Sequence, residues 1–229
     1  MGKVFFVTGT DTEVGKTLIT ASLIRAMRKR GMEAGGYKPL QSGVDEWSAS
    51  DAGILTRISG LEGQEVLTYS FLEAIAPAFA INKHEAFIDK MEIINEIDKL
   101  RGKFDILFVE GAGGWLVPYF PGQLVADWAS ELKAPVIVIG RAALGTINHT
   151  LLTVEAIQNR QLEVAAIILS GATPSNQELA EMNKQYIKEH LSNIPVFLVP
   201  WVEGEDQWEK IQSLSEQPEI QLAIQYLCC

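Results

Sequence analysis

The fold of this chain is decided by residues 6–17, which read FVTGTDTEVGKT. The β-branched and aromatic residues at 3–8 predict a buried strand, and the pattern at 16–30 predicts a helix that ends at Gly31. A loop that joins a strand to a helix and ends in Gly-Lys-Thr is typical of phosphate-binding loops. Its backbone N–H groups converge on phosphate oxygens, and the N-terminus of the helix adds partial positive charge.

Three residues of this loop carry specific expectations. Gly15 lets the backbone come close to a phosphate, Lys16 is expected to reach the β- and γ-phosphates, and the Thr17 hydroxyl is expected to coordinate Mg²⁺. The standard motif has four residues between its first glycine and Gly-Lys-Thr, whereas this loop has five. The loop is therefore one residue longer than the standard one.

Short apolar runs alternate with longer amphipathic segments along the rest of the chain. Further strands are predicted at residues 34–38, 104–110, 136–140, 164–169 and 196–199, and further helices at 84–100, 124–132, 147–161 and 176–191. This alternation predicts an α/β fold, with a mainly parallel sheet and helices on both faces. Because no linker, repeat or low-complexity tract interrupts it, residues 1–229 are expected to form a single P-loop domain.

The composition excludes several classes of protein. Hydrophobic residues make up 47% of the 229 residues and charged residues 21%, which rules out a disordered chain, a collagen-like repeat and a coiled coil. The net charge of -10 argues against nucleic acid and against anionic membranes as partners, but a locally positive site still accepts an anionic small ligand. No apolar run approaches the roughly 18 residues of a transmembrane helix, and no signal-peptide cleavage pattern occurs. We therefore expect a cytoplasmic protein.

The cysteines and histidines predict no metal site. The two cysteines, Cys228 and Cys229, cannot build a disulfide framework or a metal-binding CxxC motif, and we expect an exposed, reduced tail. His84, His149 and His190 lack metal-ligand spacing and are expected at surfaces or interfaces.

A second motif follows the predicted strand at 104–109, which ends in Glu110. A carboxylate at the carboxyl end of a buried strand is placed to assist Mg²⁺, and ligands bind at such strand ends. The four small residues that follow, Gly111, Ala112, Gly113 and Gly114, favour close approach of a ligand to the backbone. The alternative is an incidental glutamate before a glycine turn.

Lys38 is the third candidate, because it ends the predicted strand at 34–38 and would face the same crevice as the phosphate-binding loop. A solvated lysine is the alternative. Ser42 and Asp51 follow nearby. Asp51 comes after Ser50 at the head of a helical pattern, so capping of that helix is its alternative role.

Together these motifs resemble the dethiobiotin synthase family, including its lengthened loop. The resemblance rests on residues 6–17, on GYKP at 36–39 followed by QSG at 41–43, and on VEGAGGW at 109–115. ADW at 126–128 and GTINH at 145–149 resemble later family segments, so the similarity runs in order from about residue 4 to residue 201.

The resemblance implies a cyclo-ligase of biotin biosynthesis that acts as a homodimer with Mg²⁺ and ATP. Its substrates would be 7,8-diaminononanoate and CO2, and its product dethiobiotin. One amine would first become a carbamate, whose oxygen attacks the γ-phosphate. The second amine would then close the cyclic urea and expel phosphate.

The same resemblance implies roles for individual residues. Lys16 and Lys38 would bracket the carbamate and the γ-phosphate, with Thr12 as a third catalytic residue, and Thr17, Asp51 and Glu110 would hold Mg²⁺. The remaining assignments divide between nucleotide and diamine. The nucleotide would contact Glu13, Val14, Gly15, Lys16, Thr17, Leu18, Asp51, Glu110, Gly111, Ala112, Gly113, Ser170, Gly171, Pro200, Trp201 and Val202, and the diamine Thr12, Ser42, Gly114 and Asn148.

Two of these assignments concern the expected dimer interface and the expected site of the nucleotide base. Asn148 would begin a helix at the dimer interface, whose N-terminal N–H groups receive the substrate carboxylate of the neighbouring subunit. Where the family often has Asn-Asp to read the base, this chain has Ser170 and Gly171. A serine hydroxyl lacks the paired donor and acceptor that suit adenine, so the preferred base stays open.

The sequence lacks features that are typical of three other P-loop classes. Partition and septum-positioning switch ATPases carry a lysine five positions before the loop lysine, where this chain has Asp11, and the apolar residues 220–227 lack the basic groups of a membrane-targeting helix. A small-molecule kinase would often use an arginine-rich lid, and arginine is sparse after Arg30. A cobyrinate-type ligase usually carries a glutaminase domain with a nucleophilic cysteine, for which this chain is too short. The switch ATPase remains the alternative.

Overall fold

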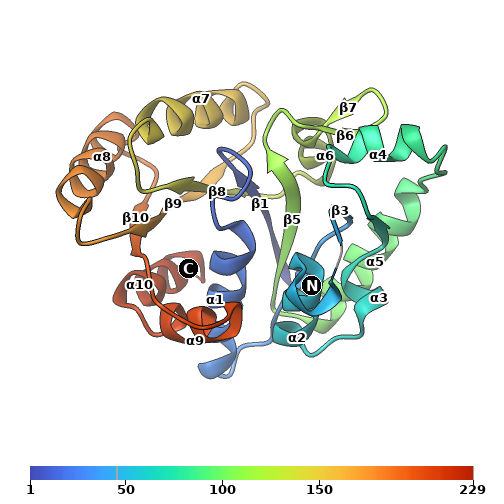
Figure 1. The fold of residues 1–229 in the computed structure, drawn as a ribbon, viewed down its shortest axis with the longest axis horizontal. Helices are drawn as coiled ribbons and strands as arrows, with labels where there is room; N and C mark the ends of the chain where they lie inside the picture. The colour runs from blue at the N-terminus through green and yellow to red at the C-terminus, as the bar shows by residue number, and fades with distance from the viewer. Residues whose placement is uncertain (45, 229) are drawn as a thin grey trace.

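A parallel sheet of six strands organises the residues that the computed structural model describes, 1–44 and 46–228 (Figure 1). The expectation for Cys229 lies outside the described residues. The strands lie in the order β10-β9-β8-β1-β5-β2. Their bounds are β1 Lys3–Gly9, β2 Ala34–Tyr37, β5 Ile106–Gly114, β8 Val136–Arg141, β9 Val164–Ala172 and β10 Val196–Pro200. The chain builds outward from β1 in both directions, which opens a crevice for a ligand at the carboxyl ends of the central strands.

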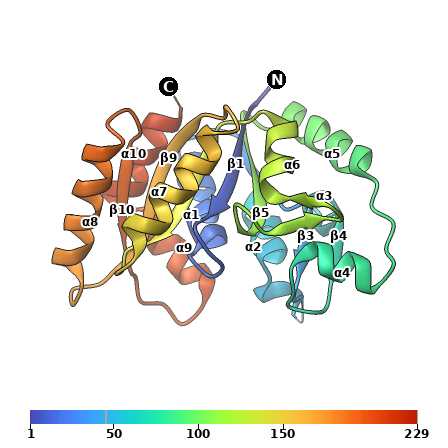
Figure 2. The same ribbon diagram turned by 90° about the horizontal axis from the view of Figure 1, so that it is seen from above.

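Helices cover both faces of the sheet (Figure 2). On one face lie α1 (Lys16–Lys29), α2 (Asp51–Ser59), α9 (Gln207–Ser215) and α10 (Pro218–Leu227), and on the other α6 (Val125–Leu132), α7 (Thr146–Gln158) and α8 (Gln177–His190). Helix α5 (Lys90–Lys103) leads into β5. Since both faces are covered, the strands are near-continuous apolar runs. The predicted α/β fold with helices on both faces is confirmed.

Smaller elements lie beside the sheet. Two short strands, β3 (Leu40–Ser42) and β4 (Tyr69–Phe71), pair in parallel, and β6 (Pro118–Phe120) pairs with β7 (Gln123–Leu124) in an antiparallel hairpin. The remaining short helices are η1 (Trp47–Ala49), α3 (Gly63–Val66) and α4 (Pro77–Lys83). None of these small elements was predicted from the sequence.

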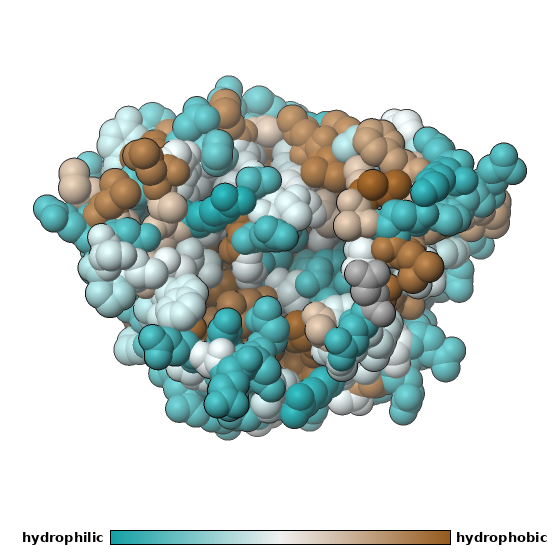
Figure 3. All heavy atoms as spheres, viewed as in Figure 1, coloured by the Kyte–Doolittle hydropathy of each residue, from teal (hydrophilic) through white to brown (hydrophobic). Residues whose placement is uncertain are grey.

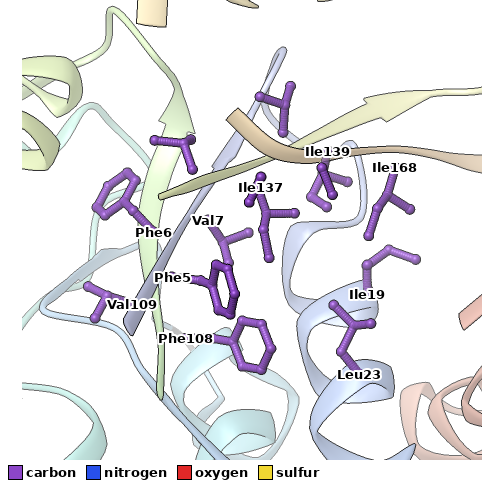
Figure 4. Packing of buried hydrophobic residues seen from close by; sticks show 14 of the residues in the cluster. Phe5, Phe6, Val7, Ile19, Leu23, Phe108, Val109, Ile137, Ile139 and Ile168 are labelled. Atoms are coloured by element: carbon purple, nitrogen blue, oxygen red, sulfur yellow. The ribbon is translucent and has the colours of Figure 1, made fainter. Parts of the chain in front are cut away.

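The core joins the central strands to α1 (Figure 4). Phe5 of β1 and Phe108 of β5 stack with their ring centroids 5.8 Å apart, on the side of the sheet where Ile19 and Leu23 of α1 lie. Phe6 points to the opposite face and meets Trp115 edge-on, with the centroids 6.3 Å apart. This packing on both faces fixes the strand ends and the start of α1, which carry the site.

Three predicted elements are corrected by the structure. The helix expected at 84–100 begins only at Lys90, because the Asp89 side chain accepts from the N–H of Met91 and caps α5 there. Ala86 and Ile88, which lie before this cap, pack against the core from a loop. The strands expected at 104–110 and 164–169 continue to Gly114 and Ala172, so the expected glycine turn is strand that pairs with Gly9.

None of the helices in the described ranges combines the length and the apolar character needed to cross a membrane. Cys228 is exposed, as expected. His84 lies near Glu73, with 2.8 Å between Nε2 and Oε2, and His190 stacks on Tyr186. These two histidines therefore have surface contacts.

Candidate active site

A pocket of about 400 Å³ lies over the carboxyl ends of β1, β2 and β5. Figure 3 shows a hollow near the centre of the view, with hydrophilic side chains inside it and a mixed hydrophilic and hydrophobic rim. The lining residues come from segments far apart in the chain. They are Thr12, Glu13, Gly15, Lys16, Thr17, Leu18, Lys38, Gln41, Ser42, Ala49, Asp51, Ile54, Ala112, Gly113 and Gln207. The structure thus brings all three sequence motifs to one pocket.

The phosphate-binding loop enters α1 through left-handed backbone. Gly15 has φ 91° and Glu13 has φ 57°, and a side chain at the first of these positions would be strained. Within the described residues no side chain caps α1 at Gly15, so its first N–H groups face the pocket. Burial lowers the pKa of Lys16, whose Nζ lies 3.5 Å from the carbonyl oxygen of Asp11. This end of α1 is built to receive an anion.

A charge cluster forms the floor of the pocket, with Lys38 and Glu110 buried and the Asp51 side chain 41% exposed. The Lys38 side chain is 3% exposed, and its Nζ donates to Glu110 Oε1 at 2.7 Å and to Asp51 Oδ2. The Thr17 hydroxyl donates to the same Glu110 oxygen at 2.7 Å. Lys38 is therefore not the solvated lysine that the sequence left open.

The two carboxylates decide the charge of this lysine. Burial lowers the pKa of Lys38, but the charges of Asp51 and Glu110 and their hydrogen bonds outweigh burial and raise it above 10.5. Burial likewise raises the pKa of Asp51, yet Lys38 holds it below 3.8. The site keeps a fixed cation between two anions.

The donor set at this floor fits Mg²⁺. Thr17, Asp51 and Glu110 offer the hard oxygen ligands that Mg²⁺ takes, and Glu110 Oε2 is buried without a hydrogen bond to any residue described. Among the described residues no group of three or more His, Cys, Asp or Glu side chains is arranged to hold a metal. Mg²⁺ needs no such group, since it binds through one or two carboxylates, waters and substrate phosphates.

The capping alternative for Asp51 is wrong. The Ser50 hydroxyl, not the Asp51 carboxylate, accepts from the N–H of Gly53 at 3.0 Å and caps α2. The N–H of Ala52 donates to the Gln41 side chain at 2.8 Å. The Asp51 carboxylate therefore takes no part in capping α2 and instead accepts from Lys38.

Some predicted residues lie at the edge of this pocket or outside it. Val14 is buried in the core, and Gly111 packs so tightly that a Cβ there would lie 3.1 Å from Phe6. Gly114 lines a neighbouring pocket of about 290 Å³, which it shares with Thr12. Asn148, in the exposed first turn of α7, lines neither of the two pockets. These positions stay predictions.

The residues expected to read the base lie together at the ends of β9 and β10. Pro200 pairs with Ala172, whose carbonyl oxygen accepts from the N–H of Trp201 at 2.7 Å. Of the five predicted positions (Ser170, Gly171, Pro200, Trp201 and Val202), none lines the 400 Å³ pocket. Ser170 nevertheless borders the loop, because a Cβ on Gly15 would lie 3.3 Å from its hydroxyl oxygen.

The sequence of this chain is similar to those of several known proteins. A family described as an AAA domain matches residues 3–206. The ATP-dependent dethiobiotin synthetase BioD of Bacillus cereus strain G9842 is 43% identical over 211 residues, which are 90% of this chain and 87% of that protein. Its counterpart from Bacillus thuringiensis strain Al Hakam is 43% identical over 205 residues, 88% of this chain and 84% of that protein. The chain belongs to the dethiobiotin synthetase family.

Two solved structures share the fold of this dethiobiotin synthetase family member. The MinD cell division protein of Aquifex aeolicus superposes with a TM-score of 0.58 and 14% identity, over 98% of this chain and 95% of that one. Chloroplast FtsY from Physcomitrella patens gives 0.50 and 16%, over 93% and 65%. At these identities the likeness is one of fold alone.

Four residues that line the pocket of this dethiobiotin synthetase family member were not predicted from the sequence: Gln41, Ala49, Ile54 and Gln207. Gln207 begins α9, where the Asp206 side chain accepts from the N–H of Glu209. An acidic residue followed three positions later by Glu is a helix-start signal. It locates α9 but does not indicate that the helix reaches the pocket.

Proposed function

We propose that this protein catalyses the ATP-dependent closure of 7,8-diaminononanoate and CO2 to dethiobiotin, a step of biotin biosynthesis. The observation that carries the proposal is the Lys38 ammonium, held between Asp51 and Glu110 beside the phosphate-binding loop. The name of the relatives, ATP-dependent dethiobiotin synthetase, supports ATP as a reactant and dethiobiotin as the product. We further propose that the protein works in the cytoplasm and as a homodimer.

The reaction proceeds through two activated forms of CO2. One amine of the diamine takes up CO2 and becomes a carbamate. A carbamate oxygen attacks the γ-phosphorus of ATP and expels ADP, giving a carbamic–phosphoric anhydride. The second amine attacks the anhydride carbonyl, phosphate leaves, and the cyclic urea forms. Every step moves negative charge, so fixed positive groups stabilise the transition states.

The charged residues at the floor of the pocket divide this work. Lys16 and the first N–H groups of α1 hold the β- and γ-phosphates, and Lys38 faces the carbamate and the transferred phosphoryl group. Thr17, Asp51 and Glu110 would hold Mg²⁺, which when bound neutralises phosphate charge. Before the ligands bind, Lys38 is protonated, because the charges of Asp51 and Glu110 outweigh burial and raise its pKa.

The diamine lies against the other side of the pocket in this proposal. Thr12, Ser42 and Gly114 position its reacting end, and Thr12 connects the two pockets because it lines both. The carboxylate of the substrate reaches the first turn of α7, at Asn148, in the neighbouring subunit. Helix α7 begins after Gly145, and no side chain in the described ranges caps it, so its N–H groups are available to an anion.

Asp11 argues against a switch ATPase. It stands where those proteins carry their signature lysine, and its carboxylate is paired with Arg141 of β8 at 2.9 Å. The same guanidinium donates to the Thr12 carbonyl oxygen at 3.1 Å. The position is thus used to hold the loop to its own sheet.

The test is phosphate release by the purified protein with Mg²⁺-ATP and bicarbonate, with and without 7,8-diaminononanoate. We expect release that depends strictly on the diamine, together with the mass of dethiobiotin among the products. Hydrolysis that ignores the diamine would overturn the proposal and favour the switch ATPase. Repeating the assay with GTP and CTP determines the base preference.

A further inference from the structure

One wall of the nucleotide pocket comes from the far end of the chain. Gln207 is the only residue after Gly113 among the described residues that line the pocket. It is exposed, and the segment that leads to it, residues 203–206, is acidic and largely exposed. The position of this wall therefore depends on what the start of α9 packs against.

The neighbouring residue supplies an anchor. The Trp208 ring lies under the guanidinium of Arg57 in α2, with Cζ 3.8 Å from the ring centroid, and Arg25 of α1 lies 5.6 Å from the same centroid. Trp208 is half-buried between these helices, and Figure 1 shows α9 lying beside α1. A cation over an aromatic face is held electrostatically as well as by packing.

Both anchoring helices begin at the pocket. Helix α1 starts with Lys16 and Thr17, and α2 starts with Asp51. Trp208 thus ties the Gln207 wall to the same two helices that carry the phosphate and metal groups. We propose that Trp208, through Arg57, is a positioning residue that holds the first turn of α9 against the bound nucleotide. The inference rests on the proposed function only in taking ATP as the ligand.

The experiment is direct titration of the purified protein with Mg²⁺-AMPPNP by calorimetry, which does not require turnover. We expect Trp208→Ala and Arg57→Ala each to weaken nucleotide binding about tenfold. Each variant loses the cation–π contact between the two side chains, and with it the fixed position of the first turn of α9. Trp208→Phe retains an aromatic face over Arg57 and should bind nearly as wild type. In a double variant the two losses should not add, because Trp208→Ala already removes the contact with Arg57.

Two further measurements separate positioning from a general structural role. Lys90→Ala removes cation–π contacts with Phe120 and Trp128, away from this pocket, and should leave nucleotide affinity unchanged. In the diamine assay, Trp208→Ala should raise the KM for ATP while kcat changes less than twofold. If Trp208→Ala does not fold, Arg57→Ala still tests the inference, because Arg57 is exposed and its removal leaves no cavity in the core.

Three results would overturn the inference: wild-type affinity in Arg57→Ala, additive losses in the double variant, or a lower Tm without a change in affinity. If the protein binds AMPPNP as expected but makes no dethiobiotin, the proposed reaction fails while the inference stands. If Gln207→Ala also binds normally, Trp208 does not act through this wall.

Discussion

The pocket at the ends of β1, β2 and β5 is built by different means from the ends of β9 and β10, where we propose that the base binds. At the ends of β1, β2 and β5, Lys38 and Glu110 are buried and joined by a 2.7 Å ion pair. At the ends of β9 and β10, Ser170 is partly exposed and Trp201 is 52% exposed. Charges that act on phosphate must be in place before the reaction and gain strength from burial, whereas contacts with a base need only an accessible edge.

Removal of Lys38 should give the largest effect, because this lysine belongs to the buried charges at the ends of β1, β2 and β5. In Lys38→Ala we expect kcat to fall by about 10²- to 10³-fold while Mg²⁺-ATP binding persists. Loss of the cation also leaves Glu110 as an unpaired buried charge, which costs about 3–5 kcal/mol of stability. Turnover and thermal unfolding check the two effects separately.

The exposed pair Lys29–Glu216 gives a control for Lys38→Ala. Lys29→Ala removes an ion pair of the same chemistry far from the site and should leave kcat unchanged. Wild-type turnover in Lys38→Ala would remove this lysine from the chemistry.

A second change on the same side tests the metal ligands. Glu110→Gln keeps the shape of the side chain but removes its charge, so we expect the Mg²⁺ concentration for half-maximal activity to rise about tenfold or more. The measurement is a Mg²⁺ titration at saturating ATP, with Asp51→Asn in parallel. Superimposable titrations of Glu110→Gln and wild type would refute a metal role.

A change on the open side should be much weaker. Ser170→Ala removes one hydroxyl that borders Gly15, and we expect the KM for ATP to change less than about threefold. Ser170 is partly exposed, so its hydrogen bond should contribute near the lower end of the usual range of about 0.5–1.5 kcal/mol. Comparing ATP with CTP and GTP sharpens the test. A tenfold loss confined to one base would show that Ser170 reads the base closely.

A carboxylate outside the site should give the smallest effect on catalysis. The N–H of Leu124 and then Arg160 lower the pKa of Asp127 below 3.8. The stability that this group contributes is therefore complete above about pH 3.8 and is lost as the pH falls through its lower folded value. We expect Asp127→Asn to lower Tm at pH 7, to differ less from wild type below pH 4, and to keep its kcat. A constant Tm difference over this range would contradict the assignment.

The sequence predicted the strongly patterned parts of the molecule correctly. The strand, loop and helix at residues 3–30 and Lys38, directly after β2, lie where they were expected. Glu110 was expected at the end of its strand but lies within β5, which continues to Gly114. The error at 84–100 arose because a helix start depends on one cap, Asp89, while the apolar spacing continues through a loop. Gln207 was missed because no local pattern records which distant surface a helix reaches.

What the sequence determined by itself is the alternation of buried strands with amphipathic helices and the phosphate-binding loop, since both depend on residues close together in the chain. The tertiary structure decided which partners the charged groups acquire. It joins Lys38 to Asp51 and Glu110, leaves Asp51 out of the helix cap, and brings α9 to the pocket. The physical reason is that local spacing sets backbone conformation, while burial, ion pairing and pKa depend on groups that only the folded sheet brings together.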